Sequence, residues 1–222
     1  MDKKITFTDI KNSKEVQTYI KQADASLEMM GYTEHSLAHA TKCAEVSGRI
    51  LTELEYNAYE VELAKIAAYM HDIGNVINRA DHAQSGAVMA FRILDKMGMS
   101  PVDTATVITA IGNHDEATAY PVNAVAAALI IADKTDVRRS RVRNKATIYT
   151  DIHDRVNYAV EKSEVSLDKE AKTITLLLTI DTHICAVMDY FEIFLQRMIL
   201  SRKAADYFGY KFKLDINGTV LL

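Results

Sequence analysis

Cysteine, proline and glycine are all scarce in this sequence. Its 222 residues include two cysteines, two prolines and eight glycines. Cys43 and Cys185 lie in separate amphipathic segments and form no C-x-x-C pair, so the sequence predicts neither a disulfide framework nor a thiolate zinc site. Any bound metal must then be held by nitrogen and oxygen donors.

Long apolar runs and an excess of positive charge are also absent. The longest apolar run, Ala124 to Ala132, is too short to span a bilayer, and residues 1–9 lack the apolar stretch of a secretory signal. With 26 basic and 30 acidic residues the formal charge is -4, so no overall positive field attracts nucleic acid or an anionic membrane. The sequence predicts a cytoplasmic protein without a membrane partner, in which any polyanion site is local.

The few helix breakers and a hydrophobic content of 49% predict a globular protein built from long helices. Apolar residues recur at helical spacing in six segments. Ser13 and Ser100 are expected to cap the first and fifth of these, the latter with Pro101 at its first helical position. The expected helices are 13–31, 34–54, 60–72, 82–97, 100–113 and 122–137, the last of them buried and central.

The hydrophobic period changes after about residue 160. Segments 173–180 and 210–216 alternate at period two, as strands do, and the segment between them carries one apolar helical face. Asn217-Gly218 is a turn signal that can close a terminal hairpin. We therefore predict a mostly α protein with a helical body at 1–159. A small α+β tail at 160–222 would contain two strands, a long helix and a terminal strand or hairpin.

The strongest chemical signal is His71-Asp72-Ile73-Gly74, a histidine and a carboxylate side by side where an apolar helix stops at a glycine. His39 lies on the apolar side of an earlier helix, and Asp133 lies within a nearly all-apolar later one. Burying an unpaired carboxylate costs several kcal/mol, so Asp133 needs a partner, and a cation is the simplest candidate.

Further histidines stand at the ends of the intervening helices. His82 begins the helix after the His-Asp pair, and His114 ends the next one, so each successive helix offers a ligand to a common centre. Imidazole and carboxylate donors suit Fe, Mn, Ni, Co or Zn, and Mg²⁺ is a further option. Two ions need about six protein ligands with one carboxylate shared. The six candidates are His39, His71, Asp72, His82, His114 and Asp133.

This ordered set resembles the signature of the HD-domain phosphohydrolases, which is a histidine, then a His-Asp pair, then an aspartate. Here the matching residues are His39, His71-Asp72 and Asp133, and the dinuclear members add two histidines at positions similar to His82 and His114. The resemblance covers about residues 34–145. It implies an HD-type helical bundle, one or two divalent metal ions, and hydrolysis of phosphate esters of a nucleotide or a small phosphorylated metabolite.

On this reading His71 and Asp72 are the catalytic pair, Asp72 bridges two ions, and a metal-bound hydroxide attacks phosphorus. Asn113-His114-Asp115 stands where the cyclic dinucleotide phosphodiesterase branch has paired histidines, and the chain lacks that branch's Gly-Tyr-Pro motif. The tail is similar to the region after the HD domain in ribonuclease Y. The alternative functions are a ribonuclease, a nucleotide-sensing module without catalysis, and a di-iron oxygenase of the same fold.

The one concentrated basic run follows Asp133 directly. This run is either a solvated face or a phosphate-binding segment at the entrance to the site. The second alternative follows because guanidinium groups bind phosphate with two hydrogen bonds. His35, one helical turn before His39, is an alternative ligand, a group that contacts a ligand or a phosphate, or simply an exposed side chain. The predicted substrate-binding residues are His35, Lys134, Arg138, Arg139 and Arg141.

Other residues outside the ordered set receive structural interpretations. His153 and His183 are expected at the surface or as helix caps. The stripe of Phe191, Phe194 and Met198 is expected in the core or in a homodimer contact, and not in a cofactor site. RNA is the partner that the basic run would serve under the ribonuclease alternative.

Overall fold

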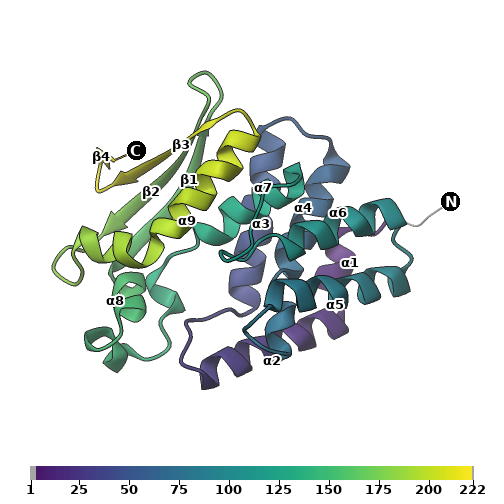
Figure 1. Ribbon diagram of the computed structural model, residues 1–222, viewed down its shortest axis with the longest axis horizontal. Helices are drawn as coiled ribbons and strands as arrows, with labels where there is room; N and C mark the ends of the chain where they lie inside the picture. Colours follow the sequence, from purple (N-terminus) through teal and green to yellow (C-terminus); the bar gives the residue numbers. More distant parts are fainter. Residues whose placement is uncertain (1–3, 222) are drawn as a thin grey trace.

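The computed structural model describes residues 4–221 and is mostly α-helical. Figure 1 shows a helical body on one side of the molecule and a small sheet on the other, with α9 lying along the sheet. The helices are α1 (Phe7–Lys11), α2 (Lys14–Met29), α3 (Leu37–Glu53), α4 (Ala58–Met70), α5 (His82–Met97), α6 (Pro101–Gly112), α7 (Ala124–Lys134), α8 (Ile152–Ala159) and α9 (Val187–Tyr207). Short 3₁₀ helices are η1 (Ile73–Val76), η2 (Arg139–Arg141) and η3 (Lys145–Tyr149).

The helix starts follow from capping side chains in the sequence. The Ser13 hydroxyl accepts a hydrogen bond from the Val16 amide, and the Ser100 hydroxyl accepts one from the Asp103 amide, with Pro101 at the first helical position. Each of the six expected helices is present, with ends one to three residues inside the predicted bounds in most cases. The helix α5 has the predicted limits at both ends.

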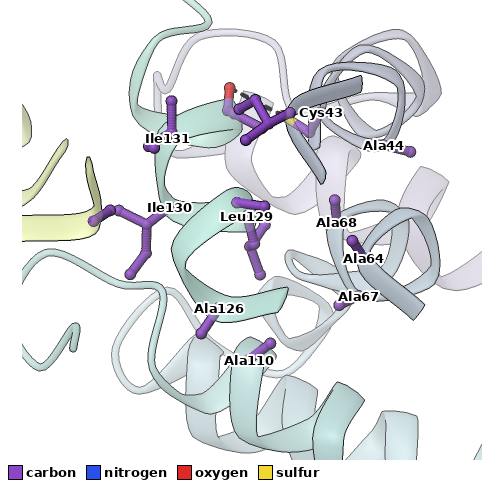
Figure 2. Packing of buried hydrophobic residues seen from close by; sticks show 14 of the residues in the cluster. Cys43, Ala44, Ala64, Ala67, Ala68, Ala110, Ala126, Leu129, Ile130 and Ile131 are labelled. Atoms are coloured by element: carbon purple, nitrogen blue, oxygen red, sulfur yellow. Dashed lines mark hydrogen bonds between the residues drawn. The ribbon is translucent and has the colours of Figure 1, made fainter. Parts of the chain in front are cut away.

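The core of the body is built around α7. All but one of its eleven residues are buried, so neighbours must cover every side of it. Figure 2 shows Leu129 pointing toward Ala64, Ala67 and Ala68 of α4, whereas Ile130 points the other way, toward α9. Small alanines on α4 and α7 let the two helices approach closely. Asp133 is thereby fixed inside the molecule at the end of a rigid element.

The tail contains a four-stranded sheet in the order β1 (Val160–Asp168), β2 (Thr173–Ile180), β3 (Lys211–Ile216) and β4 (Thr219–Val220). The β2–β3 pair is parallel, so α9 serves as its crossover helix, while the other two pairs are antiparallel. Figure 1 shows α9 between this sheet and α7. Within α9, Phe194 and Met198 are buried, which confirms their prediction as core residues, and Phe191 is half-buried and packs against the core.

The predicted helical body with a small α+β tail is therefore correct as a description of the fold. The division at residues 159 and 160 stays a prediction, although α8 ends at Ala159 and β1 begins at Val160. Within residues 4–221 there is no helix whose length and hydropathy would let it cross a bilayer.

Candidate metal centre

Each candidate ligand stands at or near the end of a helix. His39 lies in the first turn of α3, and Asp133 is the penultimate residue of α7. His82 opens α5. The His71-Asp72 pair links α4 to η1, and His114 follows the end of α6. Helix ends from five elements therefore meet at one buried point.

Gly74 allows two of these helix ends to approach. A Cβ atom at this position would lie 2.0 Å from the carbonyl oxygen of His82 and 2.5 Å from the amide nitrogen of Gly86. Both distances are far below van der Waals contact, so only glycine fits here. The glycine of the His-Asp-Ile-Gly segment thus brings Asp72 and His82 to the same site.

Four donor atoms form a first group around one point. His39 Nε2 lies 3.4 Å from His71 Nε2, 3.4 Å from Asp133 Oδ1 and 3.7 Å from Asp72 Oδ2. His71 Nε2 lies 3.2 Å from Asp72 Oδ2 and 3.7 Å from Asp133 Oδ1. Ligands placed about 2.1 Å from a single ion are about 3.0 to 3.4 Å apart, so this spacing suits one divalent transition metal.

A second group forms on the other oxygen of Asp72. His82 Nε2 and His114 Nε2 lie 3.2 Å apart, and they lie 3.5 and 3.9 Å from Asp72 Oδ1. Asn75 donates a hydrogen bond of 2.9 Å to the same oxygen and so fixes the carboxylate plane. The Asp72 carboxylate thus faces the first group with Oδ2 and the second group with Oδ1.

The four histidines present the same ring nitrogen to the centre. Each Nδ1 lies within hydrogen-bond distance of a protein oxygen, which fixes its proton on Nδ1 and turns the Nε2 lone pair inward. The acceptors are Asp136 Oδ2 for His39 at 2.8 Å, Ala68 O for His71 at 2.7 Å, Arg79 O for His82 at 3.0 Å and Ile111 O for His114 at 2.6 Å. Ring-nitrogen lone pairs and carboxylate oxygens here face one another inside the molecule, with few hydrogen-bond donors among them. Such an arrangement needs a cation to compensate it.

The electrostatics of the cluster agree with this requirement. Burial alone would raise the pKa of Asp133, but the Lys134 ammonium and the neighbouring rings hold it well below its usual range. Burial lowers the pKa of His82 and His114, so both rings are neutral and ready to bind a metal. For His71, burial is outweighed by the Asp72 and Asp133 carboxylates, which raise its pKa to about 10. Without a metal, a proton on His71 supplies the missing positive charge.

Cys43 also approaches the cluster from the next turn of α3. Its sulfur lies 3.7 Å from both ring nitrogens of His39, and His39, Cys43, His71 and Asp133 offer donor atoms within 4.8 Å of one another. Burial raises the pKa of this thiol well above its usual value. Without a metal the thiol is therefore protonated, and a ligand set of nitrogen and oxygen alone stays a prediction.

Two adjacent cavities lie beside the cluster. A small one of about 20 Å³ lies directly against Asp72, His82, His114 and Asp133. A larger one of about 450 Å³ lies next to it, toward α8 and α9, and falls in the size range of small-molecule sites. The two share the lining residues His35, Arg79, Asp115, Glu116, Arg141 and Arg197.

The predicted substrate-binding residues separate into two sets. His35, Lys134 and Arg141 line the small cavity beside the cluster. Of the described residues that line the two cavities, none is Arg138 or Arg139. The structure thus brings three of the five predicted residues to the site.

The guanidinium groups outside the cavities are engaged by other protein groups. Arg138 donates to Asp136 Oδ1 at 3.0 Å and to Glu34 Oε2 at 3.1 Å. Arg139 donates to the Tyr158 carbonyl oxygen at 2.6 Å and lies over that ring. Arg138 therefore compensates the buried Asp136 carboxylate, and Arg139 anchors η2 to α8.

Sequence reasoning did not identify Asp136, Arg79 and Arg197. Asp136 is buried and bonded to His39, and its position three residues after Asp133 was the only signal available. Arg79 contacts Asn75 and His82, and Arg197 reaches the cavity from α9. Both arginines are isolated in the sequence, so only the fold reveals their place.

The remaining histidines occupy the expected peripheral positions. His35 bonds the Thr33 carbonyl oxygen through Nδ1 at 2.7 Å, and its ring lies 5.4 Å from the His39 ring. His153 is mostly exposed but also lines the larger cavity, and His183 is exposed. Among these three, His35 is the one nearest to the cluster, and it faces the space where a substrate would lie.

Comparison with known proteins places this chain in a family. The chain is 26% identical over 186 residues to an uncharacterized protein of Methanocaldococcus jannaschii, MJ1020, covering 73% of this chain and 71% of that protein. It is also similar to the crystal structure of a predicted HD superfamily hydrolase from an uncultured Thermotogales bacterium. That match has 25% identity and a TM-score of 0.45, and it covers 56% of this chain and 68% of the other. The HD domain model matches residues 32–193, well over half of the chain. The chain therefore belongs to the HD domain family.

Proposed function

We propose that this protein is a metal-dependent phosphohydrolase that cleaves the phosphate ester of a nucleotide or a small phosphorylated metabolite. The proposal rests on one observation: four histidine Nε2 atoms and both oxygens of Asp72 face two adjacent points. His39, His71 and Asp133 would hold one ion with Asp72, and His82 and His114 would hold a second. Bound divalent ions at such a site neutralise phosphate charge and lower the pKa of water.

The residues of the chain supply binding and orientation. Lys134 donates to Asp133 Oδ2 at 2.6 Å, so its ammonium is fixed at the edge of the cluster. Arg141 is held by the carbonyl oxygens of Asp136 and Glu34 at 2.7 and 2.9 Å. These two cations and Arg79 border the space beside the ligands, where the non-bridging oxygens of a phosphate ester would lie.

The larger cavity favours a small substrate over RNA. Its lining combines the apolar side chains of Tyr32, Ile193 and Phe194 with the polar ones of Asp154 and Asn157. Such a mixed lining is typical of sites for small organic molecules. The basic run, which would bind a polymer, instead directs Arg138 and Arg139 to Asp136 and Tyr158. The leaving group of a small phosphoester would occupy this cavity.

The direct test is a hydrolysis screen of the metal-reconstituted protein. Nucleotides, dinucleotides, sugar phosphates and short RNA are offered with Mn²⁺, Fe²⁺, Co²⁺, Ni²⁺, Zn²⁺ and Mg²⁺, with Asp72→Ala as the inactive control. We expect phosphate release from a small phosphoester and none from the variant. Turnover of RNA alone would favour the ribonuclease, and metal-dependent oxygen uptake without hydrolysis would favour the oxygenase.

A further inference from the structure

The space directly over the metal-ligand cluster is too small for a phosphate group. The small cavity measures about 20 Å³. One water needs about 10–15 Å³ measured in this way, so the space holds a single water, whereas a phosphate has five heavy atoms. A side chain that lines this cavity must therefore move before a phosphoester can reach Asp72 and Asp133.

Most of the lining side chains are held by partners within the molecule. The histidines are held through Nδ1, and Lys134 by Asp133. Arg141 is held by two backbone carbonyl oxygens. Arg79 donates to Asn75 Oδ1 at 3.3 Å and lies over the Tyr32 ring at 5.5 Å. None of these groups can leave without breaking contacts inside the molecule.

Asp115 and Glu116 both line the small cavity from the connection between α6 and α7, and of these two only Glu116 is an exposed residue. Its Oε1 accepts a hydrogen bond from Arg197 Nε at 2.7 Å and lies 3.9 Å from Lys134 Nζ. The side chain of Glu116 is 31% exposed, whereas that of Lys134 is 6% exposed. A carboxylate that can turn into solvent thus sits between two cations at the entrance to the ligand cluster.

We propose that the substrate phosphate takes the place of the Glu116 carboxylate between Arg197 and Lys134. Arg197 is then a substrate-binding residue that α9 contributes to the active site, and Glu116 is the anion that occupies its guanidinium group until substrate arrives. This inference deepens the proposed function and rests on it for the identity of the substrate. The anion site itself depends only on these three side chains.

The exchange also explains how the two cavities become one. When Glu116 turns outward, the space over the ligands joins the 450 Å³ cavity that Arg197 also lines. The Arg197 guanidinium group can then bind a phosphate with two hydrogen bonds. In its contact with Glu116 it donates one hydrogen bond, from Nε. The phosphate lies at the cluster, and the organic part of the substrate lies toward α8.

Binding of inorganic phosphate measured by titration calorimetry tests this exchange without relying on turnover. The protein is titrated both metal-loaded and metal-free, because Arg197 and Lys134 are present in each form. Glu116→Gln keeps the shape of the side chain but removes the competing charge, and we expect it to tighten phosphate binding by about tenfold. Glu45→Gln, at an exposed position on α3, is the matched control and should leave the affinity unchanged.

The second arm concerns the cation. Arg197→Gln should weaken phosphate binding by about tenfold or more, Arg197→Lys should restore part of it, and Arg202→Gln on the exposed side of α9 should have no effect. In the double variant Glu116→Gln, Arg197→Gln the gain from Glu116→Gln should largely disappear, because the two residues act on one anion.

Three results would overturn the proposal: weaker phosphate binding by Glu116→Gln, unchanged binding by Arg197→Gln, or full additivity of the two changes. A protein that hydrolyses none of the phosphoesters in the screen but shows the expected binding pattern would refute the proposed function and leave the anion site standing. A protein that hydrolyses them with an unchanged binding pattern would do the opposite. The two proposals can therefore fail separately.

Discussion

His39 Nδ1 and Asp136 Oδ2 lie 2.8 Å apart, and neither side chain is exposed to solvent. The contact turns His39 Nε2 toward His71 and Asp133. The negative charge of Asp136 is compensated by Arg138 and Lys42, because Oδ1 lies 3.0 Å from Arg138 Nε and 3.2 Å from Lys42 Nζ. Within the basic run after Asp133, Arg138 thus acts on a carboxylate behind the ligand, and of the four arginines of the run Arg141 is the one that borders the two cavities.

The first prediction is that Asp136→Asn weakens metal binding by about 10- to 100-fold without removing the ligand set, because a carboxylate that bonds a ligating histidine orients it and raises its basicity. Metal affinity is measured by competition with a chelator. Asp151→Asn, at a carboxylate on the rim of the larger cavity, is the control. Equal affinities of Asp136→Asn and the parent would exclude this positioning role.

The second prediction concerns the bridging carboxylate. Asp72→Ala should lose both metal and hydrolysis while keeping a folded helical protein, because its two oxygens face the two groups of histidines. Elemental analysis of the purified variant and its far-UV circular dichroism give the two readouts. A variant that retains full metal and full turnover would show that Asp72 is not a metal ligand.

The third prediction separates one ion from two. His82→Ala and His114→Ala should lower the metal content toward one ion per chain, since their Nε2 atoms lie 3.5 and 3.9 Å from Asp72 Oδ1, the oxygen that faces away from the first group. His153→Ala and His183→Ala should bind metal as the parent does. If all four variants retain the parent's metal content, the site is mononuclear.

The ordered histidines and aspartates were accessible to sequence reasoning because burial makes each of them chemically unusual. Asp133 interrupts an apolar helix, and the His-Asp-Ile-Gly segment ends another, so both stand out locally. Helix limits were predictable for the same local reason, since Ser13, Ser100 and Gly98 mark the ends.

What the sequence did not reveal depends on tertiary contacts. The residues of β1 were not identified, because its burial pattern shows few inward positions and it carries charged side chains, as exposed strands do. Arg197 lies about eighty residues from its partner Glu116 in the sequence, and nothing near it signals a binding site. The role of Arg138 was also hidden, because a charged run does not indicate which carboxylate it faces.

The fourth prediction is that Gly74→Ala destabilises the protein by about 1–3 kcal/mol or more and also lowers occupancy of the second ion. The new methyl group would meet the His82 carbonyl oxygen at 2.0 Å, so η1 and α5 must separate, and His82 moves with α5. Gly112→Ala is the matched control, because its nearest contact is at an ordinary 3.7 Å. Thermal unfolding and metal analysis of both variants give the comparison, and similar behaviour of the two would contradict the close-approach argument.

The last prediction is that the metal-free protein is most stable near pH 6.5 and loses stability on both sides. Burial lowers the pKa of His35, His82 and His114 below the usual 6.5, so the unfolded chain binds more protons than the folded one as the pH falls below 6.5. Stability is therefore lost toward acid. For His71 the shift is upward to about 10, so its contribution is complete below 6.5 and is lost as the pH rises from 6.5 toward 10.

Bound metal should remove the alkaline loss alone, because an ion replaces the proton between His71 and its two carboxylates. Melting temperatures between pH 5 and 9, with chelator and with saturating metal, measure both limbs. The lowered pKa values of Asp72 and Asp133 act below pH 4 and do not enter this window. His71→Gln should flatten the alkaline limb of the metal-free protein, whereas His183→Gln should leave it unchanged. A melting temperature that rises steadily from pH 6.5 to 9 without metal would show that His71 does not carry the compensating charge.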